Sequence, residues 1–278
     1  MTADPSDRDN FCYRHPDRQS FILCQRCGRT ICPSCQTQAS VGVHCPECVK
    51  EARANAPKRP PLTTRFARAA RGSRSGRPVV TYTLIAISVL VFVAQTFGGD
   101  LVTFWLRMDP SIVDSKPFSP LTSIFAHGGI LHLGLNMLSL FFIGPILENA
   151  LGRWRYLALY LIAGLGGSAA VSLLGYETAA VGASGSIFGL LAALVVLQRG
   201  IGGDVRQLLV ILGLNLVIGF FAASISWQAH VGGIAAGAAV GLVLLRTRNV
   251  RQRGMQIGLL LGIAAILLAV IFVSPFVR

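Results

Sequence analysis

The stretch Val181-Gly182-Ala183-Ser184-Gly185-Ser186-Ile187-Phe188-Gly189 is a glycine-rich turn that runs directly into an apolar helix. Ser184 is the candidate nucleophile. Glycine and serine also serve as ordinary helix starters and close-packing residues, so the motif alone is equally compatible with a structural role. Catalysis is favoured by the positions of three other polar side chains, His230, His132 and Asn136, once the chain is laid across a membrane.

The composition is typical of a polytopic, all-α membrane protein. Hydrophobic residues make up 53% of the 278 positions and charged residues only 13%, which is too apolar for a soluble domain of this length. We expect no signal peptide, because the N-terminus is polar and the first long apolar run begins near Pro78. A span needs about 20 residues, and seven apolar stretches approach that length. They are about 79–97, 129–147, 154–174, 184–199, 206–224, 228–246 and 255–275.

The distribution of lysines and arginines along the chain predicts its orientation in the membrane. The net charge is +13, and nine Lys/Arg against one Glu lie between Lys50 and Arg77, just before the first span. Such a run holds a segment in the cytoplasm and near anionic lipid. The charge of the chain up to residue 49 is nearly balanced, which argues against nucleic-acid binding by that part. The loops expected on the same side are also basic. They contain Arg153, Arg155, Arg199, Arg206, Arg246, Arg248, Arg251 and Arg253.

This topology places three polar residues at the same depth in the membrane. Spans two, four and six all run from the outside to the inside, and His132, Ser184 and His230 each lie near the start of one of them. All three therefore belong on the extracytoplasmic side. Polar side chains within a bilayer are costly, which makes them functional candidates.

A serine beside a histidine predicts nucleophilic catalysis. The imidazole of His230 can take the proton of Ser184 and later protonate a leaving amine. We expect a dyad, because the acidic residues near this level lie in outer loops. Ser186 is a rival nucleophile that cannot share a face with Ser184, and Phe188 is expected to pack on the imidazole or simply in the core.

Two further positions suit an oxyanion hole. His132 and Asn136 are four residues apart and share one helical face. Together with the backbone N–H of Ser184, they could donate hydrogen bonds to a tetrahedral intermediate; an interhelical hydrogen bond is the structural alternative for Asn136.

Glycines predict how the helices pack. Gly233, Gly237 and Gly241 repeat every four residues, a pattern that lets two helix backbones approach closely and would bring spans four and six together. The similar series Gly254, Gly258 and Gly262 is expected to serve packing alone.

Residues 12–48 form a separate metal module. Four ligand pairs, each with a two-residue spacer, can hold two tetrahedral Zn²⁺ ions. The pattern resembles the B-box type zinc finger, and the resemblance implies one site of Cys12, His15, Cys32 and Cys35. It implies a second site of Cys24, Cys27, Cys45 and Cys48, in which His44 could replace a neighbour. A redox thiol cluster is the weaker alternative, and so short a module needs its metal to fold.

Residues 79–246 resemble the rhomboid family of intramembrane serine proteases. The residues that carry this resemblance are Gly182, Ser184, Gly185, Ala229, His230, Gly233, His132, Asn136, Gly144, Glu148 and Gly152. The resemblance implies a Ser–His dyad, an oxyanion hole at His132 and Asn136, no catalytic cofactor, and cleavage of transmembrane helices near their outer end. Glu148 is expected to be structural, and the seventh span would make a six-plus-one form.

Together these observations predict four segments. They are a two-zinc module (1–49), a basic flexible linker (50–78), a six-span catalytic core (79–246), and a basic loop with a seventh helix (247–278). We expect an intramembrane serine endopeptidase in a bacterial cell membrane, with its N-terminus cytoplasmic. Its partners would be transmembrane protein substrates, the lipid bilayer and an unknown protein partner of the zinc module. The alternative is a catalytically silent rhomboid-like protein that binds transmembrane clients.

Overall fold

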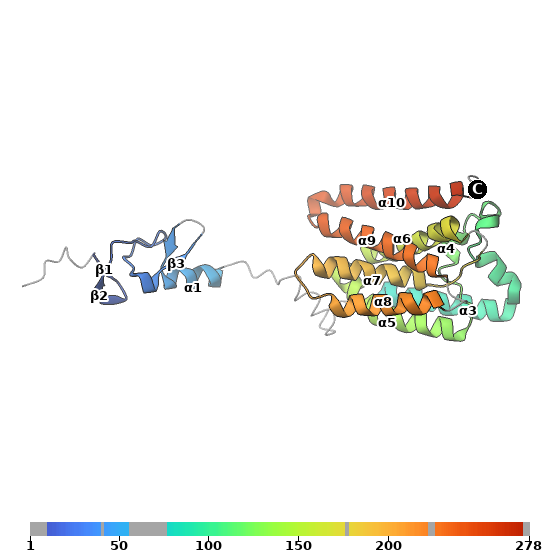
Figure 1. The fold of residues 1–278 in the computed structure, drawn as a ribbon, viewed down its shortest axis with the longest axis horizontal. Coiled ribbons are helices and arrows are strands. Elements are labelled where there is room, and N and C mark those ends of the chain that lie inside the picture. Colours follow the sequence, from blue (N-terminus) through green and yellow to red (C-terminus); the bar gives the residue numbers. More distant parts are fainter. Residues whose placement is uncertain (1–9, 40–41, 56–76, 176–177, 222–225, 275–278) are drawn as a thin grey trace, which may run out of the picture. The chain divides into compact units, whose positions relative to one another are not determined.

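A computed structural model describes residues 10–39, 42–55, 77–175, 178–221 and 226–274 (Figure 1). The chain divides into two compact units, Met1–Arg59 and Pro60–Arg278. Most of the predicted linker falls outside the described residues, and residues 50–55 at its start continue a helix of the first unit.

The N-terminal unit consists of two small antiparallel sheets and two short helices. Strands β1 (Phe11–Cys12) and β2 (His15–Gln19) form one sheet, and β3 (Thr37–Gln38) and β4 (Val43–His44) the other. The helices are η2 (Pro33–Cys35) and α1 (Pro46–Asn55). The buried cluster contains only one aliphatic side chain, Ile31, beside six cysteines. Such a core buries too little apolar surface to stabilise a unit of this size by itself.

The second unit is a bundle of helices. Its long elements are α3 (Val79–Leu106), α5 (Ile130–Leu151), α6 (Arg153–Leu174), α7 (Ser184–Arg199), α8 (Arg206–Phe221), α9 (Trp227–Arg246) and α10 (Arg253–Val273). The short ones are η3 (Pro110–Ser115), α4 (Ser119–Thr122) and η4 (Val250–Gln252). Of the helices in the described ranges, five are long and apolar enough to cross a membrane, and α7 and α8 are shorter apolar helices. The described elements therefore form a core of six helices with one additional C-terminal helix, as the sequence predicts.

Helix α3 extends beyond the predicted first span. The span was expected to end near residue 97, but the helix continues to Leu106 after a break at Gly99, where φ is +60° and ψ is −151°. Only glycine adopts this conformation readily, so the break occurs where the sequence has two adjacent glycines. The part after the break leads into the loop that ends at α4.

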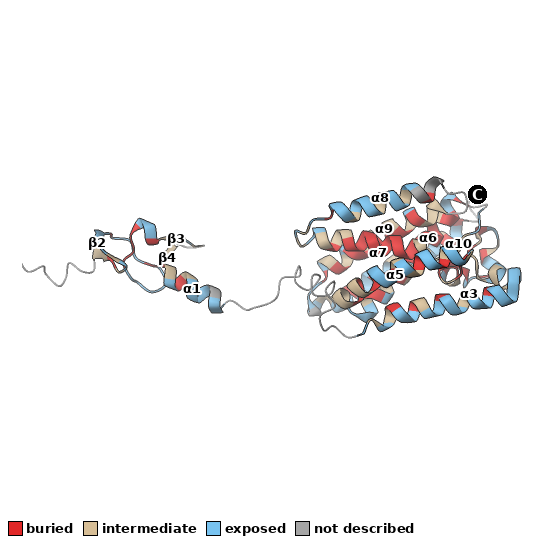
Figure 2. Cartoon of the chain, turned by 90° about the horizontal axis from the view of Figure 1, so that it is seen from below, coloured by how far each residue is buried: buried red, intermediate tan, exposed pale blue. Residues whose placement is uncertain are grey.

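Buried residues are concentrated in α6, α7 and α9, whereas the outer helices α3, α8 and α10 expose much of their surface (Figure 2). The exposed surface of α10 is apolar and includes Leu259, Leu261 and Ile266. A helix this apolar and this exposed is suited to lipid rather than water. The chain is therefore an integral membrane protein.

Small residues allow α9 to lie in direct backbone contact with α7. A Cβ placed on Gly233 would overlap the carbonyl oxygen of Gly185, and one on Gly237 would overlap that of Gly189. The close approach predicted from the glycine repeat is thus present. On its other side α9 packs on α6, where a Cβ on Gly232 would overlap the carbonyl oxygen of Gly166.

Glu148 fixes the start of α3 on α5. Its buried carboxylate accepts hydrogen bonds from the backbone N–H groups of Val80 (3.0 Å) and Thr81 (2.8 Å) and from the Thr81 hydroxyl (2.8 Å). The first N–H groups of a helix have no partner within the helix, and a negative charge is favourable there. Glu148 therefore has the structural role expected from the sequence.

Candidate active site and metal sites

The start of α7 presents the Ser184 hydroxyl at the edge of a tight turn. Gly182 has φ +125°, a value that side chains rarely tolerate, and its N–H donates to the Ser123 carbonyl (2.9 Å). A Cβ on Gly182 would lie 2.7 Å from the His132 ring. Glycine is therefore required at this position for two reasons: the backbone conformation, and the space that the His132 ring occupies.

Ser184 and His230 are brought together by the contact of α7 with α9. The distance from His230 Nε2 to Ser184 Oγ is 3.0 Å, which is a hydrogen bond. His230 lies in the first turn of α9, where the Ser226 hydroxyl accepts from the Ala229 N–H (3.4 Å) and caps the helix. Ser184 is the first residue of α7, and His230 lies in the first turn of α9, so the contact joins the starts of two helices.

The Phe188 ring holds the imidazole from one face. Its centroid is 4.1 Å from that of His230, and the two ring planes differ by 16°. Phe188 is one helical turn after Ser184, so the same face of α7 presents the hydroxyl and the ring. The stacking restricts rotation of the imidazole about its side-chain bonds.

His230 Nδ1 is buried and has no hydrogen-bond partner among the described residues. With the neutral ring's proton on Nδ1, Nε2 is free to accept the Ser184 proton. This is the protonation that a general base needs.

Ser186 points elsewhere. Its hydroxyl is buried without a hydrogen-bond partner in the described part of the chain, and it lies 2.7 Å from where a Cβ on Gly164 of α6 would be. Ser186 therefore faces α6, whereas Ser184 faces α9. Of the two serines, only Ser184 contacts the histidine.

His132 of α5 lines the space beside Ser184, and Asn136 follows one turn later on the same helix, with its amide nitrogen 3.8 Å from where a Cβ on Gly182 would be. A pocket beside Ser184 is lined by His132, Gly182, Ser123 and Ser168 among others. The Gly128 N–H donates to His132 Nδ1 (3.4 Å), which leaves the proton of the neutral ring on Nε2, the atom that lies against Gly182. Asn136 is buried, and its amide donates to the His132 carbonyl (3.0 Å).

Gln95 and His127 are additional polar residues of this region that sequence reasoning missed. The Gln95 amide accepts from the His127 N–H (2.9 Å) and donates to the His127 carbonyl (3.2 Å) and to Thr103 Oγ1 (3.0 Å). The His127 ring lies edge-on to His132, with centroids 5.2 Å apart. A glutamine within an apolar span was the available signal, because a polar group at that depth needs a partner.

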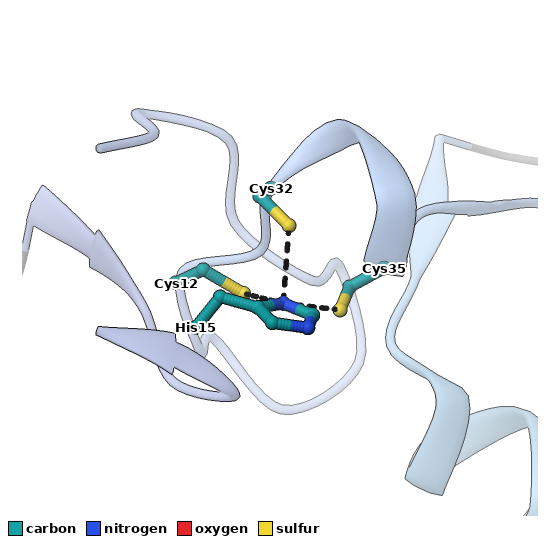
Figure 3. A group of neighbouring side chains, drawn as sticks. All are labelled: Cys12, His15, Cys32 and Cys35. Carbon is teal, nitrogen blue, oxygen red and sulfur yellow. Dashed lines mark hydrogen bonds between the residues drawn. The ribbon is translucent and has the colours of Figure 1, made fainter. Parts of the chain in front are cut away.

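The N-terminal unit contains two clusters that could hold metal ions. Cys12, His15, Cys32 and Cys35 form one, and Cys24, Cys27, Cys45 and Cys48 the other, with the ligand atoms of each cluster within 4.8 Å of one another. Figure 3 shows three sulfurs around the His15 ring, at 3.4–3.7 Å from Nδ1. The two clusters have the ligand composition and the pairing expected from the sequence, with Cys45 and not His44 in the second.

The protonation of these thiols reflects their crowding. Burial, together with the neighbouring sulfurs, raises the pKa of Cys35 to about 11 and that of Cys48 to about 12. Burial acts in the same direction on Cys12 and Cys24, but hydrogen bonds from backbone N–H groups outweigh it and lower the pKa of each to about 6. Thiolates packed this closely repel one another, and a bound dication removes that repulsion.

Comparison with known proteins identifies the family of the helical unit. Residues 115–247 match the Rhomboid domain family. The chain is 33% identical over 207 residues to the Rhomboid protease GluP of Bacillus subtilis (strain 168). The aligned region covers 69% of this chain and 40% of that protein. It is 41% identical over 134 residues to RHOMBOID-like protein 5 of Arabidopsis thaliana (45% of this chain, 43% of that protein). It is 34% identical over 160 residues to Rhomboid-type serine protease 2 of Emericella nidulans (51% and 31%).

The chain spans less than half the length of each of these relatives. The matched region covers the helices that bear Ser184, His230, His132 and Asn136. The domain match, the relatives and the helical architecture agree with one another, and the chain belongs to the rhomboid family.

Proposed function

We propose that this protein is an intramembrane serine endopeptidase, with Ser184 as nucleophile and His230 as general base and acid. The observation that carries the proposal is the 3.0 Å contact between His230 Nε2 and Ser184 Oγ at the start of two apolar helices. Relatives named as proteases give it independent support.

The reaction would follow from the positions of these groups. Ser184 Oγ attacks the peptide carbonyl carbon while His230 Nε2 takes the hydroxyl proton, and the same nitrogen then protonates the leaving amine. Water, activated by His230, next attacks the acyl-enzyme ester and releases the new carboxyl end along with free Ser184. The negative oxygen formed in each step would be stabilised by the Ser184 N–H, His132 Nε2–H and the Asn136 amide.

We place cleavage near the extracytoplasmic end of transmembrane substrates. Basic residues concentrate in the loops that this orientation puts inside. The site is buried among helices, so hydrolysis needs a water-filled path from the outer surface.

We further propose that the two cysteine-rich clusters bind structural Zn²⁺. Bond lengths of about 2.3 Å for Zn–S and about 2.0–2.1 Å for Zn–N put tetrahedral ligands about 3.5–3.8 Å apart. The N···S separations of 3.4–3.7 Å around His15 and the 3.7 Å between the sulfurs of Cys27 and Cys45 match these values. Bound ions would hold the N-terminal unit together as a module, before a linker that begins after α1 instead of at residue 50 and ends at residue 78, the catalytic core (79–246) and the last helix (247–278).

The test is labelling of the purified full chain with a fluorophosphonate, a probe that reacts with activated serines, alongside cleavage of a model transmembrane substrate. Both should be lost in Ser184→Ala and His230→Ala and retained in Ser186→Ala, the matched control from the same helix. Labelling that persists in Ser184→Ala would refute the proposed nucleophile. A parent chain that is folded but neither labels nor cleaves would favour a silent client-binding protein.

A further inference from the structure

The N-terminal unit exposes three consecutive large apolar residues. Phe21, Ile22 and Leu23, here called the apolar edge, are 73%, 45% and 52% exposed. None of them belongs to the buried cluster of this unit. Contiguous apolar surface of this kind marks a place where a protein meets another apolar phase.

The apolar edge is held in place by backbone pairing. The Ile31 N–H donates to the Ile22 carbonyl (2.8 Å), the Cys24 N–H donates to the Arg29 carbonyl (2.9 Å), and Leu23 forms a β-bridge with Thr30. Metal ligands at positions 24 and 32 border this paired region. The edge is therefore presented in a fixed conformation, which reduces the entropy lost on binding.

Aromatic and cationic groups extend the edge on one side. Leu23 lines a groove with Phe11, Tyr13 and Arg29, and the Arg29 guanidinium lies 5.2 Å from the centre of the Tyr13 ring. Aromatic rings next to arginine are suited to the boundary between lipid headgroups and acyl chains.

The arginines of this unit differ in their partners. Arg14 pairs with Glu47 (3.8 Å) and Arg26 with Glu51 (3.5 Å). Within the described residues, Arg18 and Arg29 form no ion pair, and Arg18 precedes the apolar edge by three positions. The Arg18 guanidinium donates one hydrogen bond to the neutral Ser34 hydroxyl (2.9 Å), so the positive charges of Arg18 and Arg29 are both left without a counter-charge that would compete with an anionic surface.

We propose that the apolar edge, with Arg18 and Arg29, inserts into the headgroup region of an anionic lipid bilayer. A bilayer is favoured over a protein partner because the unit is covalently joined to a membrane-spanning chain, which keeps its effective concentration at a lipid surface high. The connecting segment contains further lysines and arginines, which anionic lipid attracts. This inference does not depend on proteolysis, so either proposal can fail without the other.

Hydrogen–deuterium exchange of the full chain in lipid nanodiscs tests it. One set of nanodiscs contains phosphatidylcholine alone, and the other contains phosphatidylcholine mixed with phosphatidylglycerol. Each arginine near an anionic surface favours binding by about fivefold, so we expect amide exchange around the apolar edge to slow by about fivefold or more in the anionic nanodiscs. Metal content, measured for every variant, shows whether the unit is still assembled.

Variants separate the contribution of the apolar side chains from that of the arginines. The double variant Phe21→Ser/Leu23→Ser should lose the protection, Arg18→Gln/Arg29→Gln should lose its dependence on anionic lipid, and Thr37→Ser, an exposed change on β3, should behave like the parent. Equal exchange in the two kinds of nanodisc would overturn the proposal and leave the edge to a protein partner. Protection that is equally strong in an uncharged detergent would also overturn it, because the contact would then be with the chain's own membrane unit.

Discussion

Gly233 of α9 lies directly against the carbonyl oxygen of Gly185 in α7, with no room for a Cβ between them. Gly185 follows Ser184, and Gly233 lies three residues after His230. The distance between the nucleophile and its base is therefore set by a contact between two backbones. Any side chain added there must separate the helices.

Replacing Gly233 by alanine should weaken both stability and catalysis. Overpacking a tight contact costs about 1–3 kcal/mol, and the shift of α9 would move His230 away from Ser184. Thermal unfolding in detergent and fluorophosphonate labelling measure the two effects. The control is Gly258→Ala on α10, where an added Cβ would meet no atom within 4 Å. Normal labelling of the Gly233 variant would show that the site does not need this contact.

Phe188→Leu should lower the cleavage rate more than it lowers stability. Aromatic stacking contributes about 0.5–1.5 kcal/mol beyond apolar burial, so loss of the ring on His230 should reduce kcat/KM by about twofold to tenfold. Leucine preserves most of the packing volume. Phe142→Leu, on the exposed surface of α5, controls for the loss of an aromatic ring. If kcat/KM stays constant while the unfolding temperature falls, Phe188 serves the core alone.

The sequence was most informative where a chemical requirement coincides with a periodic pattern. Apolar length predicted the spans, and their alternating direction placed the starts of three helices at one level. That reasoning predicted one shared depth for Ser184 and His230, and the structure brings their side chains into contact. Helical spacing also predicted that Ser184 and Ser186 face different directions. It could not predict that Gly164 of α6 leaves the space into which Ser186 points.

Packing partners could not be predicted from spacing alone. The series at Gly233, Gly237 and Gly241 packs on α7, whereas Cβ atoms on Gly254, Gly258 and Gly262 would meet nothing within 4 Å. The expectation that the second series serves packing is therefore wrong within the described chain. Equal spacing places glycines on one face of their own helix, but whether another helix lies there depends on the whole bundle.

Removal of metal should unfold the N-terminal unit and spare the membrane unit. Chelation would remove the proposed metal–ligand bonds, and the buried cluster of the described residues contains Ile31 as its one aliphatic side chain to replace them. Limited proteolysis should then cut within residues 10–55, while fluorophosphonate labelling of Ser184 persists. Cys45→Ser should bind one ion fewer per chain, and Ser34→Ala, between two ligands of the other cluster, should bind the parental amount. Unchanged resistance to protease after complete metal removal would contradict a structural role for the ions.

Gln95→Leu should impair the site from a helix that contains none of the proposed catalytic residues. The variant leaves the His127 N–H and carbonyl without the amide that bonds both, and a buried polar group without a partner costs about 1–3 kcal/mol. The loop that these bonds hold also supplies the Gly128 N–H that orients His132. We therefore expect lower kcat at similar KM, because His132 would stabilise the oxyanion less well. Thr96→Val is the matched control, since Thr96 is exposed and bonds only to the Phe92 carbonyl of its own helix. A rise in KM at unchanged kcat would instead place Gln95 in substrate binding and contradict its effect on His132.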